Sequence, residues 1–137
     1  MNEYFEECIE LSKKAYDLGE IPVGAVVVKN NIIIGRGYND RQSNHNVTGH
    51  AEIIALLEAE QFLNDWRLDG CDLYVSLEPC EMCYAIINEA RIKNVYFLLN
   101  NTYNQNKYKV KRTKVCINND FSEIYKKMLI NFFNKLR

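Results

Sequence analysis

The chain of 137 residues lacks several features that would place it in other classes of protein. Its apolar runs fall far short of the roughly twenty residues that a membrane-spanning helix needs, so we expect no transmembrane segment. The first residues, Met1 to Glu7, are acidic and contain no basic region followed by an apolar stretch, which argues against a signal peptide. Without repeats or low-complexity linkers, residues 1–137 are expected to form one domain, located in the cytoplasm.

The number and spacing of the cysteines argue against a disulfide framework. The five cysteines are odd in number, and Cys80 and Cys83 stand at the spacing of a metal-binding pair. Cys8 and Cys116 lie within apolar patterns, where we expect inert core thiols. A reducing compartment therefore suits the sequence better than an oxidising one.

The net charge of -1 conceals an uneven distribution. From Arg91 onward there are eleven basic and two acidic residues, a charge of +9, whereas the preceding part has six basic and sixteen acidic residues, a charge of -10. Within the basic third, cations alternate with other residues and could form either a row on one face of a strand that contacts RNA, or a solvated edge that discourages strand pairing. The residues concerned are Lys107, Tyr108, Lys109, Lys111, Arg112 and Lys114.

A split motif carries the chemistry: His50-Ala51-Glu52, followed about thirty residues later by Pro79-Cys80-Glu81-Met82-Cys83. Zinc prefers tetrahedral coordination by imidazole and thiolate, and a catalytic site uses three protein ligands so that water takes the fourth position. We expect His50, Cys80 and Cys83 to bind one zinc ion per subunit. Glu52 is expected to move protons, because a carboxylate beside an activated water can take up and return a proton.

The spacing also predicts local structure. Residues two apart within a helix do not share a face, so His50 and Glu52 can converge only where a helix begins. The residues after His50 are good helix formers, and Thr48-Gly49 is the expected capping region. Because Pro79 ends a strand-like run before a second helix, two helix N-termini should meet at the metal and favour the thiolate form of the cysteines.

Each half of the motif, taken alone, also occurs outside catalytic sites. A single His-x-Glu arises by chance on surface helices, and a lone Cys-x-x-Cys can be a redox pair or half of a structural zinc site. A structural site would need a fourth ligand, for which His45 and Cys71 are the nearest candidates, but neither has a suitable spacing. The two halves together favour a catalytic site.

Periodicity predicts an α/β fold, specifically a three-layer α/β/α domain around a mixed sheet of about five strands. A strand, helix and strand around the Cys80 motif should give a parallel pair with the metal at the strand carboxyl ends.

The predicted elements are an amphipathic helix over Phe5–Tyr16, strands over Val23–Lys29, Ile32–Tyr38, Asp72–Leu77 and Val95–Leu99, helices after His50 and Cys80, and a final helix with an apolar stripe from Phe121 to Leu136. Asn30-Asn31 suits a two-residue hairpin turn.

The split motif, read with Leu77-Glu78, resembles the cytidine/deoxycytidylate deaminase superfamily, and within it the bacterial tRNA-specific adenosine deaminases. Residues 20–28, 37–39 and 132–137 support the resemblance, which covers about the first hundred residues well. After Leu99 the chain departs from the family, which usually has a Gly-Ala-x-Gly-Ser segment soon after this strand.

The resemblance implies a cytidine-deaminase-like fold, a homodimer, and hydrolytic deamination of adenosine to inosine at the wobble position of a tRNA anticodon loop. It places Asn39 against the purine and the apolar Pro22, Val23 and Leu77 around the ring, while small Ala51 leaves room for the base. Each of these residues could also serve the fold alone, as a strand or turn residue. The alternatives are a deaminase of free guanine, cytosine or cytidine, and a non-catalytic zinc-bearing subunit, against which Glu52 argues.

Overall fold

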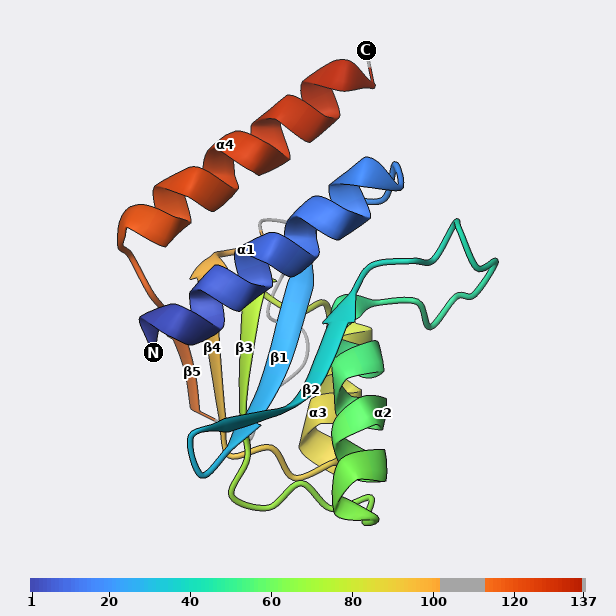
Figure 1. Cartoon of the computed structure of the whole chain (residues 1–137), viewed down its shortest axis with the longest axis vertical. Helices are drawn as coiled ribbons and strands as arrows, with labels where there is room; N and C mark the ends of the chain where they lie inside the picture. Colours follow the sequence, from blue (N-terminus) through green and yellow to red (C-terminus); the bar gives the residue numbers. More distant parts are fainter. Residues whose placement is uncertain (102–112, 137) are drawn as a thin grey trace.

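The computed structural model describes residues 1–101 and 113–136, which form four helices and five strands (Figure 1). The predicted helices and strands are all present in this part of the chain. The helices are α1 (Asn2–Asp17), α2 (Ala51–Leu63), α3 (Glu81–Glu89) and α4 (Asp120–Lys135), and the strands are β1 (Gly24–Lys29), β2 (Ile32–Tyr38), β3 (Asp72–Leu77), β4 (Asn94–Leu99) and β5 (Thr113–Cys116).

The five strands form one mixed sheet in the order β2-β1-β3-β4-β5. Strand β1 is antiparallel to both β2 and β3, whereas β3, β4 and β5 run parallel. The run of valines in β1 is buried on both faces, as expected for an interior strand covered on each side. The parallel β3–β4 pair joined through α3 confirms the predicted strand–helix–strand unit.

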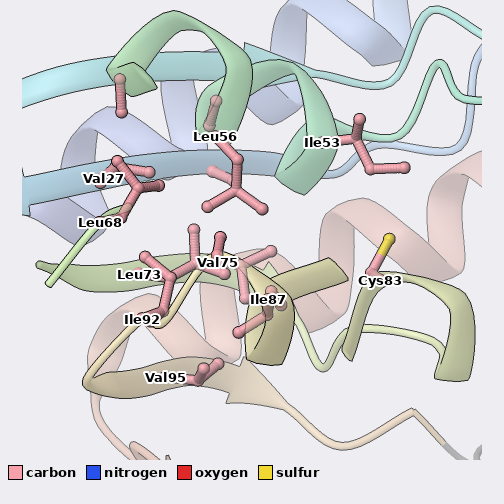
Figure 2. Close-up of a cluster of buried hydrophobic side chains, with 14 of the residues drawn as sticks. Val27, Ile53, Leu56, Leu68, Leu73, Val75, Cys83, Ile87, Ile92 and Val95 are labelled. Atoms are coloured by element: carbon pink, nitrogen blue, oxygen red, sulfur yellow. The ribbon is translucent and has the colours of Figure 1, made fainter. Parts of the chain in front are cut away.

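Helices cover both faces of the sheet, which confirms the three-layer α/β/α prediction (Figure 1). On one face α2 and α3 pack Leu56 and Ile87 against Val75 of β3 (Figure 2). On the other face α1 and α4 pack Phe5 and Tyr125 into a second core. Each core contains side chains that are almost completely removed from water, so the sheet is held from both sides.

The β1–β2 hairpin has the predicted two-residue turn. Asn30 and Asn31 have φ values of 51° and 64°, and Lys29 pairs with Ile32. Two consecutive positive φ values define the primed turn that matches strand twist, and Asn tolerates this conformation better than most residues.

Glycines in β2 set the distance between this strand and α2. A methyl group at Gly37 would collide with the carbonyl oxygen of Ala51, and one at Gly35 would collide with that of Ala55. The absence of side chains at these two positions lets the helix backbone lie directly on the strand. The start of α2, where His50 lies, is thereby fixed against the sheet.

One prediction about burial was wrong. Cys8 is fully buried as expected, but Cys116 is exposed, because β5 is the edge strand and all four of its residues are open to solvent. The apolar stripe of α4 is only partly covered: Phe132 is buried, whereas Phe133 is 45% and Leu136 is 68% exposed. Within α4 the buried residues are Ser122, Tyr125 and Phe132, so the apolar stripe of the sequence is wider than the buried side of the helix.

No helix among residues 1–101 and 113–136 is long and apolar enough to cross a membrane.

Candidate active site

The two halves of the motif meet where two helices begin. His50 is the N-cap residue of α2 and Cys80 the N-cap residue of α3, with Cys83 in the first turn of α3. This confirms the prediction that both halves open helices. Figure 2 shows Cys83 at the same end of the apolar cluster as Ile53 of α2.

The three predicted ligand atoms lie close enough to share one ion. The Nδ1 atom of His50 is 3.9 Å from the Sγ of Cys80 and 3.6 Å from the Sγ of Cys83, and all three atoms lie within 4.8 Å of one another. Ordinary Zn–N and Zn–S bond lengths with tetrahedral angles give an N···S separation of about 3.6 Å. The donor set and its spacing therefore suit a single zinc ion.

The cap of α2 comes from a residue that the sequence did not indicate. Thr48 was expected to cap this helix, but its backbone N–H and hydroxyl both donate to Asn46. Instead, Oδ1 of Asn39 accepts the backbone N–H of Ala51 at 2.9 Å, and its Nδ2 donates to the carbonyl oxygen of Ile21 at 3.0 Å. Asn39 lies eleven residues before His50, so no local capping pattern reveals it.

Glu52 lies in the first turn of α2 beside the ligands and is only 4% exposed. Its burial raises the pKa of the carboxyl group to about 7, because the charged form loses its hydration. A carboxyl group with such a pKa can both take up and release a proton near neutral pH. The position and the pKa of Glu52 therefore agree with the predicted proton transfer.

The thiols are polarised by each other and by the imidazole. A hydrogen bond with the Cys83 thiol, together with the neighbouring His50, lowers the pKa of Cys80 to about 4. The hydrogen bond with Cys80 in turn raises the pKa of His50. The site thus favours a thiolate at Cys80, which is the form that binds a metal cation, whereas the hydrogen bond with Cys80 and burial raise the pKa of Cys83.

A hollow of about 140 Å³ lies next to the ligands. Of the predicted substrate residues, Val23, Asn39 and Leu77 line it. Ala51 is fully buried, and the carbonyl oxygen of Pro22 accepts the hydroxyl of Tyr125 at 2.7 Å, so their contact with a substrate stays a prediction. The sequence did not single out three further lining residues, which are Ile21, Glu78 and Asn101.

A second hollow of about 280 Å³ adjoins the first. Ile21, Asn39 and His50 line both, so the two hollows share a wall. The far side of the second hollow is formed by residues that include Arg41 and the Phe132-Phe133 pair of α4. The C-terminal end of the chain thereby borders the candidate site.

Buried Glu20 anchors the loop that forms one side of this second hollow. Its carboxylate accepts the backbone N–H groups of Gln42 and Ser43, at 3.1 and 2.8 Å, and the hydroxyl of Ser43 at 2.9 Å. Burial alone would raise the pKa of Glu20, but these hydrogen bonds outweigh it and lower the pKa below its usual value. Because the loop residues are twenty-two and twenty-three positions away, sequence patterns gave no signal for this contact.

The predicted RNA contacts fall mainly in the stretch between residues 101 and 113. Lys107, Tyr108, Lys109, Lys111 and Arg112 lie outside the described residues. The next cation of that row, Lys114, lies in β5, where its Nζ donates to Oε2 of buried Glu78 at 3.4 Å.

Deaminases of the cytidine-deaminase-like class share this combination of a three-layer fold and a His-Cys-Cys ligand set with a neighbouring glutamate. A family model described as MafB19-like deaminase matches residues 1–137. The chain therefore belongs to the MafB19-like deaminase family.

Sequence relatives point in the same direction. The chain is 45% identical over 121 residues to the tRNA-specific adenosine deaminase of Buchnera aphidicola, covering 88% of this chain and 70% of the relative. It is 44% identical over 94 residues to the tRNA-specific adenosine deaminase of Bacillus subtilis, covering 69% of this chain and 58% of that protein. The match thus spans less than two thirds of the second relative's length.

Solved structures superpose on most of this chain. One, from a study of A-to-I editing by tRNA wobble-position deaminases, superposes with a TM-score of 0.77 at 31% identity, covering 85% of this chain and 98% of the other. A guanine deaminase from Bacillus subtilis superposes with a TM-score of 0.70, also at 31% identity, covering 86% and 83%. Deaminases of two substrate classes are therefore similar to this chain.

Proposed function

We propose that residues 1–137 form one zinc-dependent deaminase domain that converts adenosine to inosine at the wobble position of a tRNA anticodon. The observation that carries this proposal is the convergence of three ligand atoms from His50, Cys80 and Cys83 with the buried carboxyl group of Glu52 beside them. The tRNA-specific relatives supply the support for the substrate.

His50, Cys80 and Cys83 would hold one zinc ion per subunit. Zinc, when bound, lowers the pKa of a water molecule to about 7 and so supplies a nucleophile at neutral pH. Glu52 would take a proton from the attacking water, pass it to a ring nitrogen of the base, and later deliver a proton to the departing amine. Water adds at the carbon that carries the amine, ammonia leaves, and adenine becomes hypoxanthine.

The shape of the site supports a base that is part of a strand. The first hollow is smaller than the roughly 300–1,000 Å³ of typical drug-sized pockets and suits one flat base between Val23 and Leu77. The adjoining hollow provides additional space, with a guanidinium group from Arg41 and an aromatic ring from Phe133. Such groups pair with phosphates and stack with bases, so this space suits the nucleotides that flank the target.

Asn39 keeps some capacity to recognise the base. Its two hydrogen bonds to the backbone use one lone pair of Oδ1 and one hydrogen of Nδ2. The second lone pair and the second hydrogen remain for a substrate. The same side chain would then cap α2, brace Ile21 and contact the purine.

A second copy of the chain is proposed to cover the outer side of α2. On this side of the helix Leu57, Phe62 and the following Trp66 are 55%, 66% and 52% exposed. Large apolar side chains left exposed often mark an interface, which supports a homodimer. All five cysteines lie in the described part of the chain and are unpaired, which supports a cytoplasmic location.

The decisive experiment offers the purified protein four substrates: a tRNA anticodon stem-loop with a wobble adenosine, free adenosine, guanine and cytidine. Mass spectrometry should detect inosine in the stem-loop, and the Glu52→Ala variant should produce none. Xanthine or uridine formation without inosine would instead support a free-base or nucleoside deaminase, which the similarity to a guanine deaminase favours. Absence of all products from the zinc-loaded protein would contradict catalysis.

A salt titration tests the proposed RNA contacts of residues 107–112. If Lys107, Lys109, Lys111 and Arg112 contact phosphates, with Tyr108 stacking on a base, stem-loop affinity should fall steeply with added salt. Affinity that does not change with salt would contradict this role.

A further inference from the structure

Glu78 is a buried carboxyl group that the proposed reaction does not use. It is the first residue after β3 and lies two positions before Cys80, with 7% of its side chain exposed. It also lines the smaller hollow beside the ligands. A buried carboxylate at this place needs partners, because desolvation penalises its charge.

The partners of Glu78 come from three other segments of the fold. Its Oε2 accepts the hydroxyl of Tyr84 in α3 at 3.1 Å and the Nζ of Lys114 in β5 at 3.4 Å. Its Oε1 accepts the backbone N–H of Asn101 at 3.2 Å, and its own N–H donates to the carbonyl oxygen of Leu99 at 2.9 Å. The residue that leads into the Cys80 turn is therefore tied to α3, to β5 and to the chain after β4.

Glu78, Tyr84 and Lys114 form a closed group. The ammonium of Lys114 lies 5.5 Å from the centroid of the Tyr84 ring, so the cation meets both the carboxylate and the aromatic face. Tyr84 is fully buried one residue after Cys83, and Lys114 is about one third exposed. A charged pair with one buried member holds its geometry more firmly than a surface pair.

We propose that Glu78 is a positioning residue for the metal centre, which holds the turn carrying Cys80 and Cys83 through Tyr84 and Lys114. This inference depends on the proposed function only in naming zinc as the ion. It also gives Lys114 a role in the metal centre rather than in a row of RNA-binding cations. Residues that orient metal ligands typically change metal affinity or activity by about 10- to 100-fold when mutated.

The test measures zinc release into an excess of a chromogenic chelator. Glu78→Gln and Lys114→Met should release zinc about 10- to 100-fold faster than the unmodified protein. Tyr84→Phe should release it faster as well, by less, because the lysine remains. Lys93→Met is the matched control: this exposed lysine lies just before β4, at the end of the β3–β4 pair away from Glu78, and release should be unchanged.

A double variant tests whether Glu78 and Lys114 act as a unit. If the pair acts as a unit, Glu78→Gln combined with Lys114→Met should release zinc no faster than Glu78→Gln alone. In the deamination assay the single variants should lower kcat while leaving KM for the stem-loop unchanged.

Two results would overturn the proposal. One is unchanged zinc release in Lys114→Met, which removes the charge from a partly exposed side chain and so tests the idea even if Glu78→Gln fails to fold. The other is faster release in the double variant than in either single variant, which would mean that the two residues act independently. Zinc release needs no substrate, so these results stand apart from the question of whether tRNA is deaminated.

Discussion

Replacing Asn39 tests whether its side chain holds the start of α2. Asn39→Ala removes the acceptor for the Ala51 N–H and the donor to the Ile21 carbonyl oxygen. Loss of a helix cap costs about 1 kcal/mol, and loss of a second hydrogen bond costs about 1 kcal/mol more. For a chain of this length the expected loss of about 2 kcal/mol lowers the melting temperature by about 7 °C, measured by calorimetry on the zinc-loaded protein.

Asn39→Asp separates the contributions of the two hydrogen bonds to stability. The carboxylate still accepts the Ala51 N–H at the positive end of α2 but cannot donate to Ile21, so we expect about half the loss of Asn39→Ala. Asn44→Ala, which removes an exposed hydrogen bond in the same loop, should change stability by less than about 0.5 kcal/mol. If Asn39→Asp were as destabilised as Asn39→Ala, the capping role would be wrong. If Asn39→Asp were stable but had a raised KM, the Nδ2 group of Asn39 would be identified as a donor to the substrate.

Three further predictions concern other parts of the site. Glu52→Gln should keep zinc, measured by metal analysis, while ammonia release falls by at least about 100-fold. Turnover comparable with that of the unmodified protein would rule out the proton shuttle. Gly37→Ala should lower the free energy of unfolding by about 1–3 kcal/mol in a urea titration, because the added methyl group meets the Ala51 carbonyl oxygen. Gly19→Ala is the comparison: its surroundings are open and its φ is 78°, so it should cost about 1 kcal/mol. Since the pKa of folded Glu20 is lowered, its contribution to stability is present above its unfolded pKa and is lost as pH falls through the folded value. Glu20→Gln should therefore melt below the unmodified protein at pH 7, and this gap should narrow in acid; a gap independent of pH would refute the role of the charge.

Local patterns were sufficient to predict most of the fold. Continuous β-branched runs gave the interior strand, the helical period gave α1 and α4, and Asn30-Asn31 gave the hairpin turn. These features depend on residues that are neighbours in the chain. The exposure of Cys116 and of Phe133 could not be predicted, because it depends on which strand is the edge and how much of a helix its neighbours cover.

In the candidate site, too, some features could be predicted from the sequence and others could not. His50, Glu52, Cys80 and Cys83 could be found because metal and proton chemistry restrict residue type and spacing. The contacts that hold them could not, since they join positions far apart in the chain. Asn39 was expected at the substrate because it opens the loop before the ligand helix, and no pattern showed that it also caps this helix.

Three buried glutamates in the described part of the chain differ in the donors that surround them, and this difference separates their roles. Glu20 accepts three hydrogen bonds from one loop, and its pKa is lowered, so it stays charged and anchors that loop. Glu78 accepts from a hydroxyl, an ammonium and a backbone N–H, so its oxygens are engaged in structure. Burial raises the pKa of Glu52 to about 7, and this residue lies beside the metal ligands. A residue that must take up a proton and release it again within one reaction cycle needs that pKa, so Glu52 is the glutamate suited to proton transfer.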